Sequence, residues 1–148
     1  MTYRMSPIGT IVNQDGKPVE LHLDPEFAPG LLGLDAWSHV DVFYWFDKND
    51  NETQRAILQV HPRRNPANPL TGVFACRAPV RPNLIALTTC RVLSVKDNVV
   101  TIDGIDAFDG TPILDLKPHI PGLDQTQEEY HVPDWVGRRP KGPRPDGN

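Results

Sequence analysis

Residues 72–87 are the first stretch of the chain whose side chains could do chemistry. Arg77 and Arg81 lie four residues apart there, and Pro79 and Pro82 stiffen the backbone around them. Prolines lower the entropy that a loop loses when it takes one shape, so this loop can hold both arginines in place. Two guanidinium groups held in this way can bind a carboxylate or a phosphate through paired hydrogen bonds. The alternative is that both are ordinary surface arginines.

Residues 103–119 form a second such stretch, in which Asp106, Asp109 and Asp115 surround a sharp Asp-Gly turn. Carboxylate oxygens could accept hydrogen bonds from ribose hydroxyls there, or bind a positive sulfonium or a metal ion. The spacing argues against a calcium loop, because it lacks the alternating ligands and the terminal glutamate of such loops. The alternative is that Asp109 caps the turn and that Asp115 pairs with Lys117 or an arginine.

Other polar side chains carry a weaker signal. His39 and Asp41 are two residues apart on a predicted strand, so they face the same side and could form a hydrogen-bonded pair for proton transfer. The alternative for His39 is a purely structural histidine. Asn83 is either a turn residue or a hydrogen-bond donor to a ligand. Cys76 and Cys90 have no base nearby in sequence, so we interpret them as small buried apolar side chains.

The composition limits the class of protein. The chain has 148 residues and a net charge of −4, which suits one domain and argues against coating nucleic acid through bulk charge, although a local basic patch stays open. Two cysteines are too few for a disulfide framework, so we expect a reducing, cytoplasmic environment. No apolar run approaches the roughly 20 residues that cross a bilayer. Glycine-rich dinucleotide motifs, phosphate loops and paired-cysteine zinc motifs are absent.

Short strands are the elements that must position these side chains. The chain has 16 prolines and 11 glycines, which disfavour long helices and favour strands joined by ordered loops. The strands that we expect are 8–13, 19–23, 38–46, 55–60, 84–95, 99–103 and 112–116, with an extended piece at 73–78. These strands predict an all-β sandwich or barrel in residues 1–135. Residues 136–148 are expected to form a tail rich in proline, glycine and arginine.

Four segments resemble the TsaA-like (TrmO) family, in the order in which that family carries them. The longest is Gly-Val-Phe-Ala-Cys-Arg-Ala-Pro-Val-Arg-Pro-Asn-Leu-Ile-Ala-Leu-Thr at 72–88. The others are Asp-Ala-Phe-Asp-Gly-Thr-Pro-Ile-Leu-Asp-Leu-Lys-Pro-His at 106–119, Trp-Ser-His-Val-Asp-Val-Phe-Tyr-Trp-Phe-Asp at 37–47 and Pro-Ile-Gly-Thr-Ile at 7–11. The resemblance implies a small, non-Rossmann β-barrel with long ordered proline-rich loops, usually a homodimer. It also implies an S-adenosylmethionine-dependent methyltransferase that N-methylates threonylcarbamoyladenosine beside the tRNA anticodon.

The resemblance also assigns roles to single residues. The implied cofactor contacts are Asp47, Lys48, Arg77, Leu87, Asp106, Ala107, Phe108 and Asp109. We expect Asp109 or His39 to accept the proton that methyl transfer removes. Arg81 and Asn83 are expected to position the RNA or the partner subunit. No metal ion and no membrane are expected.

Departures from the family pattern keep other functions open. The chain reads Gln-Asp-Gly-Lys-Pro-Val at 14–19, where many members have a Pro-Arg-Gln-like segment at the cofactor, and Asp47 replaces a histidine. The alternatives are a methyltransferase with another RNA or a small-molecule acceptor, and a non-catalytic dimer that binds S-adenosylmethionine. A basic tail at 138–144 could supply an RNA contact in place of the C-terminal domain of some members.

Overall fold

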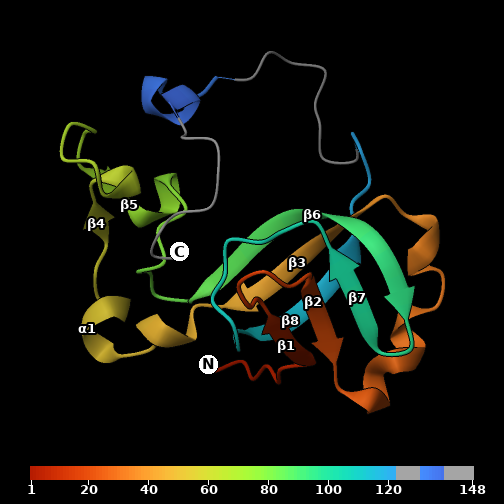
Figure 1. The fold of residues 1–148 in the computed structure, drawn as a ribbon. Helices are drawn as coiled ribbons and strands as arrows, with labels where there is room; N and C mark the ends of the chain where they lie inside the picture. Colours follow the sequence, from red (N-terminus) through yellow and green to blue (C-terminus); the bar gives the residue numbers. More distant parts are fainter. Residues whose placement is uncertain (123–130, 139–148) are drawn as a thin grey trace.

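A closed barrel of six antiparallel strands forms the body of the protein in this computed structural model (Figure 1), which describes residues 1–122 and 131–138. Neighbouring strands around the barrel follow the order β1-β2-β7-β6-β3-β8, and β8 closes onto β1. The barrel strands are β1 Gly9–Val12, β2 Val19–Leu23, β3 His39–Trp45, β6 Ile85–Lys96, β7 Val99–Ile102 and β8 Pro112–Pro118. The predicted all-β barrel is therefore confirmed.

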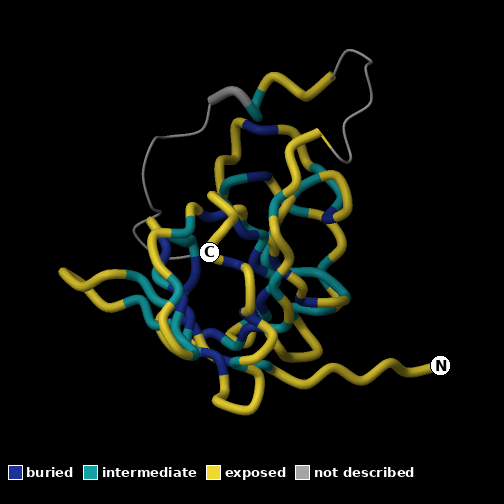
Figure 2. Tube along the Cα trace, turned by 90° about the vertical axis from the view of Figure 1, so that its right-hand side faces the viewer, coloured by how far each residue is buried: buried dark blue, intermediate teal, exposed yellow. Residues whose placement is uncertain are grey.

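Alternating side chains fill the barrel. Along β3, Val40, Val42 and Tyr44 are buried, whereas the residues between them face outward and are half-buried. A strand points successive side chains to opposite faces, so the apolar alternation of this sequence selects the inward face. Figure 2 shows the buried residues concentrated along the barrel strands. The fully buried core includes Ile11, Leu21, Val40, Val42, Leu84, Val100, Ile102 and Ile113.

A lobe of short elements, residues 51–83, interrupts the barrel between β3 and β6 and lies to one side of it (Figure 1). The lobe elements are α1 Glu52–Arg55, β4 Gln59–Val60, η4 Pro62–Arg64, β5 Thr71–Gly72 and η5 Val73–Ala75, and the 3-10 turn η3 Asp47–Asn49 leads into it. Two further 3-10 turns, η1 Pro25–Leu31 and η2 Leu34–Ala36, connect β2 to β3.

Two secondary-structure predictions were wrong in the lobe, the strand at 55–60 and the extended piece at 73–78. The expected strand 55–60 is helical at its start, because the Asn51 side chain accepts a hydrogen bond from the Gln54 amide at 2.9 Å and caps α1. Only the last two residues of that range form a strand, β4, which pairs with β5 instead of joining the barrel. The expected extended piece 73–78 begins as the 3-10 turn η5.

The C-terminal 3-10 turn η6, Asp134–Arg138, packs against the lobe. The Arg63 guanidinium donates hydrogen bonds to the carbonyls of Trp135 and Val136, both at 3.0 Å, and lies over the Trp135 ring at 5.5 Å. The expected start of the tail at residue 136 falls inside this turn, and residues 139–148 lie outside the described residues. The boundary between domain and tail therefore stays a prediction. No helix in the described ranges is long and apolar enough to cross a bilayer.

Candidate functional site

Tyr44 marks the end of the barrel at which the candidate residues meet. Its side chain points inward from β3 and is 3% exposed. The hydroxyl donates its single proton to the Asp106 carbonyl at 3.1 Å, so the Thr88 hydroxyl at 3.0 Å is the donor to it. Burial raises the pKa of Tyr44, and the charges of Asp106 and Arg77 also act on it. The carboxylate stretch therefore contacts this tyrosine through the Asp106 carbonyl, and Ala86 of the arginine-bearing stretch pairs with it in the strand register.

Residues 103–111, which we call the carboxylate loop, connect β7 to β8 at this end of the barrel. Asn13, just beyond β1, holds the loop from the other side: its Nδ2 donates to the Ala107 carbonyl at 2.8 Å and to the Ile105 carbonyl at 3.4 Å. The Asn13 amide also donates to Oδ1 of Asp109 at 2.9 Å. Asp109 thus ties the loop to the residue after β1 and does not cap its own turn, while its Oδ2 has no hydrogen bond within the described residues. Sequence analysis missed Asn13, whose only signal was a polar residue at a strand end.

Lys48 joins the start of the lobe to the carboxylate loop. Its Nζ lies 4.0 Å from the centre of the Phe108 ring, which is a cation–π distance. Asp47 precedes it and is exposed in the same turn, η3. The implied cofactor residues Asp47 and Lys48 are therefore brought close to residues 106–109, although the two segments are about 60 positions apart in sequence.

Residues 73–83, which we call the arginine loop, hold their shape through Arg81. The Arg81 side chain donates to the carbonyls of Ala78 at 3.0 Å, Cys76 at 2.8 Å and Val73. This guanidinium therefore organises its own loop. Arg77 is exposed, and within the described residues it has no hydrogen bond or ion pair. Of the two arginines, Arg77 is the one available to a ligand.

Asn83 and Leu87 follow the arginine loop at the start of β6. Both are exposed, and the Asn83 carbonyl accepts a hydrogen bond from the Ile85 amide at 2.9 Å. Leu87 lies beside Phe43 in the strand register and faces the outside of the barrel, whereas its neighbour Thr88 contacts Tyr44 from within. Leu87 is thus near the site in sequence but on the other side of the sheet.

His39 lies at the opposite end of β3 from Tyr44, about 17 Å away at the usual rise per residue. Its Nδ1 is 2.8 Å from the Ser38 hydroxyl. The pair with Asp41 that the strand spacing allows does not form: the Asp41 carboxylate bonds instead to His119, just after β8, at 3.1 Å and to the Thr89 hydroxyl of β6 at 2.6 Å. The structure therefore does not bring the two proton-acceptor candidates, His39 and Asp109, together.

The remaining candidates have structural partners. Asp115 forms an exposed ion pair with Lys117 at 3.2 Å, which is the alternative that the sequence left open. Cys90 is buried, and burial raises the pKa of its thiol to about 12. Cys76 is half-buried and donates weakly to the Gly72 carbonyl at 3.5 Å. Within residues 1–122 and 131–138, no three metal-binding side chains gather.

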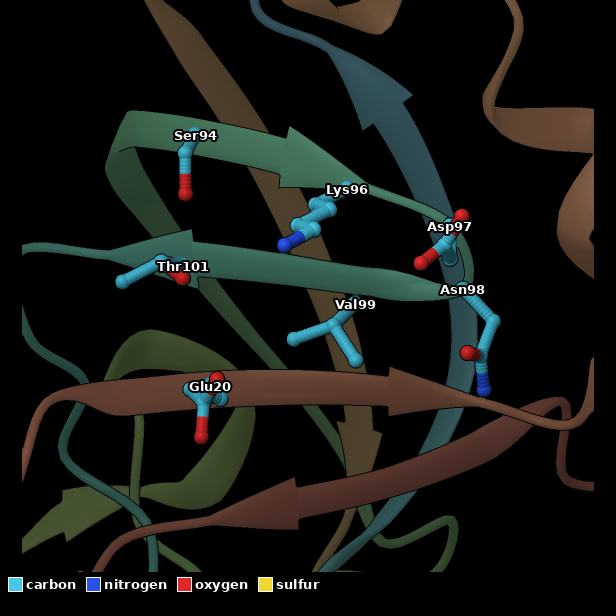
Figure 3. A pocket seen from close by; sticks show the side chains of 7 residues that line it. All are labelled: Glu20, Ser94, Lys96, Asp97, Asn98, Val99 and Thr101. Carbon is cyan, nitrogen blue, oxygen red and sulfur yellow. The ribbon is translucent and has the colours of Figure 1, made fainter.

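A hollow on the surface of the barrel lies away from this site. Figure 3 shows it along the outer side of β2, β6 and β7, lined by Glu20, Ser94, Lys96, Asp97, Asn98, Val99 and Thr101. Another hollow lies between η1 and the tip of the β6–β7 hairpin. Neither contains a residue that the sequence singled out. Neither of these two hollows is therefore part of the candidate site around Tyr44.

Most of the chain matches one known protein family. Residues 4–125 match the family model of the tRNA-methyltransferase O N-terminal domain, so the barrel is a domain type found in tRNA-modifying proteins. The chain belongs to the tRNA-methyltransferase O (TrmO) family, which confirms the resemblance that the four sequence segments carry.

Curated relatives extend over most of the chain. The chain is similar to a probable S-adenosyl-L-methionine-binding protein of Methanocaldococcus jannaschii, 44% identical over 82% of this chain and 96% of the relative. A probable S-adenosyl-L-methionine-binding protein of Pyrococcus horikoshii is 41% identical over 86% of this chain and 90% of that protein. A human tRNA (adenine(37)-N6)-methyltransferase is 42% identical over 66% of this chain, but the match covers only 21% of that enzyme.

Solved TrmO structures share the barrel. The crystal structure of TrmO from Pseudomonas aeruginosa is 29% identical and superposes with a TM-score of 0.65 over 88% of this chain. Another TrmO crystal structure is 32% identical, with a TM-score of 0.67 and the same coverage of this chain. The matches cover 62% and 64% of those two chains, so the solved proteins contain further parts that this comparison does not reach.

Proposed function

We propose that the protein is an S-adenosylmethionine-dependent methyltransferase that N-methylates threonylcarbamoyladenosine next to the tRNA anticodon. The observation that carries the proposal is the carboxylate loop, which the Tyr44 hydroxyl holds through the Asp106 carbonyl and which has the Lys48 cation over its Phe108 ring. The exposed cation Arg77 lies near enough for its charge to act on the pKa of the same tyrosine. The names of the archaeal relatives support binding of this cofactor, and those of the mammalian relatives support methyl transfer to tRNA.

The chemistry of the side chains fits an amino-acid nucleoside. The Arg77 guanidinium can bind the carboxylate of the methionine part through charge-assisted hydrogen bonds. The carboxylates of Asp106 and Asp109 can accept hydrogen bonds from ribose hydroxyls. Ala107 is a buried residue of the carboxylate loop, and the ring of Phe108 offers an apolar surface beside Lys48. Asp47 and Leu87 complete the cofactor set that the family pattern implies, and Asn83 is proposed, with Arg81, to position the RNA or the partner subunit.

When bound, S-adenosylmethionine supplies a methyl group on a positive sulfonium. The protein must then hold the acceptor nitrogen in line and receive one proton from it. Asp109 is the proposed acceptor, because its Oδ2 lies at the site while Asn13 fixes the rest of the carboxylate. His39 lies at the opposite end of β3 from the site of its own subunit, so its proposed role depends on the homodimer that the family pattern predicts. Arg81 shapes the arginine loop, and through it the RNA-facing side that we propose.

A second candidate function is binding of S-adenosylmethionine without catalysis. It is favoured by the names of the two archaeal relatives, which state binding alone. A third alternative is a methyltransferase that uses the same cofactor but methylates another RNA or a small molecule. The experiments below therefore test binding and methyl transfer separately.

Titration calorimetry with S-adenosylmethionine tests the binding step. We expect the wild-type protein to bind and the Arg77→Ala variant to lose about 1.5–3 kcal/mol of binding free energy, the size of a hydrogen bond to a charged group. The Arg91→Ala variant, which removes an exposed arginine from the outer face of β6, is the control and should bind as the wild type does. No heat from the wild-type protein at millimolar ligand would reject every form of the proposal.

Mass spectrometry of nucleosides tests the acceptor. tRNA from a strain that lacks the protein is incubated with protein and S-adenosylmethionine, and we expect methylated threonylcarbamoyladenosine to appear. The Asp109→Asn variant keeps an oxygen acceptor for the Asn13 amide but is a poor base, so it should lose about 10²–10⁴-fold in rate with its fold intact. Cofactor binding with no methylated nucleoside would instead support the binding-only function.

A further inference from the structure

The lobe, residues 51–83, concentrates positive charge in an acidic protein. It contains five arginines and one glutamate, a net charge of +4, whereas the whole chain has a net charge of −4. The barrel and its other loops, residues 1–50 and 84–122, contain six lysines and arginines against 13 aspartates and glutamates. Because the lobe also ends in the arginine loop, this charge lies directly beside the candidate site (Figure 1).

Two of the lobe arginines occupy an unfavourable backbone conformation. Arg63 and Arg64 have φ angles of 58° and 52°, in the left-handed region that favours glycine, asparagine or aspartate. Backbone strain of this kind persists where the surrounding structure holds it in place, and it concentrates at functional sites. His61 and Asn68 supply that support here: the Asn68 side chain donates to the Pro62 carbonyl at 2.8 Å, and its own carbonyl lies 2.8 Å from the His61 ring. The structure therefore holds arginine side chains at a bend that suits other residues better.

An aromatic side chain is exposed beside this charge. Phe74 is 83% exposed in η5, three residues before Arg77. An exposed ring within a positively charged segment is what proteins use to stack unpaired bases while cations bind the adjoining phosphates. The Arg81 contacts fix the backbone from Val73 to Ala78, so the ring is presented by a rigid turn.

Arg63 also connects the lobe to the basic C-terminal sequence. Its guanidinium holds η6 through two backbone carbonyls, and residues 138–148 follow with four lysines and arginines against one aspartate. The basic C-terminal sequence therefore follows an element that is bound to the lobe and not to the acidic barrel.

We propose that the lobe is the surface on which single-stranded RNA docks, with its arginines on phosphates and Phe74 stacked on an unpaired base. This inference rests on the proposed function for the place of the reaction, but it concerns Phe74 and the lobe arginines other than Arg77, which the proposed function assigns to the cofactor. A hairpin loop is the kind of RNA that offers unpaired bases and closely spaced phosphates together. Duplex RNA, whose bases are stacked inside, offers only the phosphates.

Filter binding of the full-length protein to an RNA hairpin with an unpaired loop, over a series of salt concentrations, tests the inference. The Phe74→Ala variant should bind the hairpin about tenfold more weakly, the effect of losing one stacked base, and should bind a duplex of equal length as the wild type does. The Arg64→Ala variant should reduce the slope of log affinity against log salt by about one on both RNAs, because one phosphate contact is lost.

Matched control variants lie on the barrel. Leu93→Ala truncates another exposed apolar side chain and Lys96→Ala removes another exposed cation, both on β6 away from the lobe, and neither should change RNA binding. The inference is overturned if the wild-type protein binds no RNA, or if the lobe variants bind RNA as the controls do. Calorimetry with S-adenosylmethionine on the same variants should give wild-type affinity. RNA binding through the lobe without methyl transfer would refute the proposed function and leave this inference standing.

Discussion

At the scale of single residues, Tyr44 contributes more to the candidate site than its place in an apolar strand indicates. Its hydroxyl connects β3 to β6 through Thr88 and to the carboxylate loop through the Asp106 carbonyl. A buried carbonyl that loses its donor costs free energy, because no water replaces the bond. Tyr44 is therefore both a core residue and the support on which the Asp106 turn rests.

The Tyr44→Phe variant tests this role. Removing the hydroxyl should lower the free energy of unfolding by about 1–2 kcal/mol and should also weaken binding of S-adenosylmethionine, because the Asp106 turn loses its anchor. Denaturant titration and calorimetry measure the two effects. Tyr3→Phe, which changes a side chain that is 84% exposed, is the control. Unchanged cofactor affinity in a destabilised Tyr44→Phe protein would separate the tyrosine from the site.

The residues that sequence analysis missed share a physical cause. Tyr44 stands in an apolar alternation, so its type and spacing indicate only an inward-facing core position. Asn13 acts on residues more than 90 positions away, and only barrel closure brings them together. The strand spacing allowed a pair of Asp41 with His39, but its actual partners are Thr89 on β6 and His119 just after β8. Contacts across strands depend on register, which this sequence does not reveal locally.

At the scale of elements, the predictions succeeded where a strand carries its own signal. β3 and β6 have the apolar alternation and β-branched residues of barrel strands, and β1 and β2 flank an Asp-Gly turn. The range 55–60 has similar residue types, yet it became a helical turn and a short strand because Asn51 caps α1 and no barrel strand lies beside it. Local composition therefore predicted the barrel strands and could not predict which segment leaves the barrel.

The pairing of β1 with β2 leaves no room for a side chain at Gly9. A Cβ atom there would lie 2.2 Å from the His22 carbonyl oxygen and 2.8 Å from the Leu23 Cα. The Gly9→Ala variant should therefore lose about 1–3 kcal/mol of unfolding free energy, as overpacked core positions do. Gly104→Ala, where a Cβ meets nothing within 4 Å, is the matched control for thermal or denaturant unfolding. Equal stability of the two variants would contradict this packing.

At the scale of the whole molecule, the interior holds two protonated acids that resist ionisation. Burial raises the pKa of Cys90 from 9.0 to about 12 and also raises the pKa of Tyr44. The unfolded chain releases these protons at lower pH than the folded protein does. The contribution of these two groups to the free energy of unfolding is therefore fully present below about pH 9. It falls as the pH rises towards the folded pKa values.

Denaturant unfolding between pH 8 and pH 12 measures this dependence. We expect the free energy of unfolding to fall above about pH 9, by up to about 1.4 kcal/mol per pH unit for each group that ionises only on unfolding. The Cys90→Ala variant should lose part of this slope. The Val100→Ala variant, which also truncates a buried barrel residue, should keep it. A Cys90→Ala slope equal to that of the wild type would contradict the assignment to this thiol.

The way Arg81 bonds to its own loop has a consequence for the rest of the protein. Its side chain bonds to three carbonyls of the same loop, so the turn that carries Phe74 and Arg77 is preorganised before any ligand binds. The conformational entropy of that turn is lost during folding, and recognition need not supply it again. All three contacts lie within the arginine loop. Substitutions elsewhere in the chain can therefore change which ligand binds while the conformation of this turn stays the same.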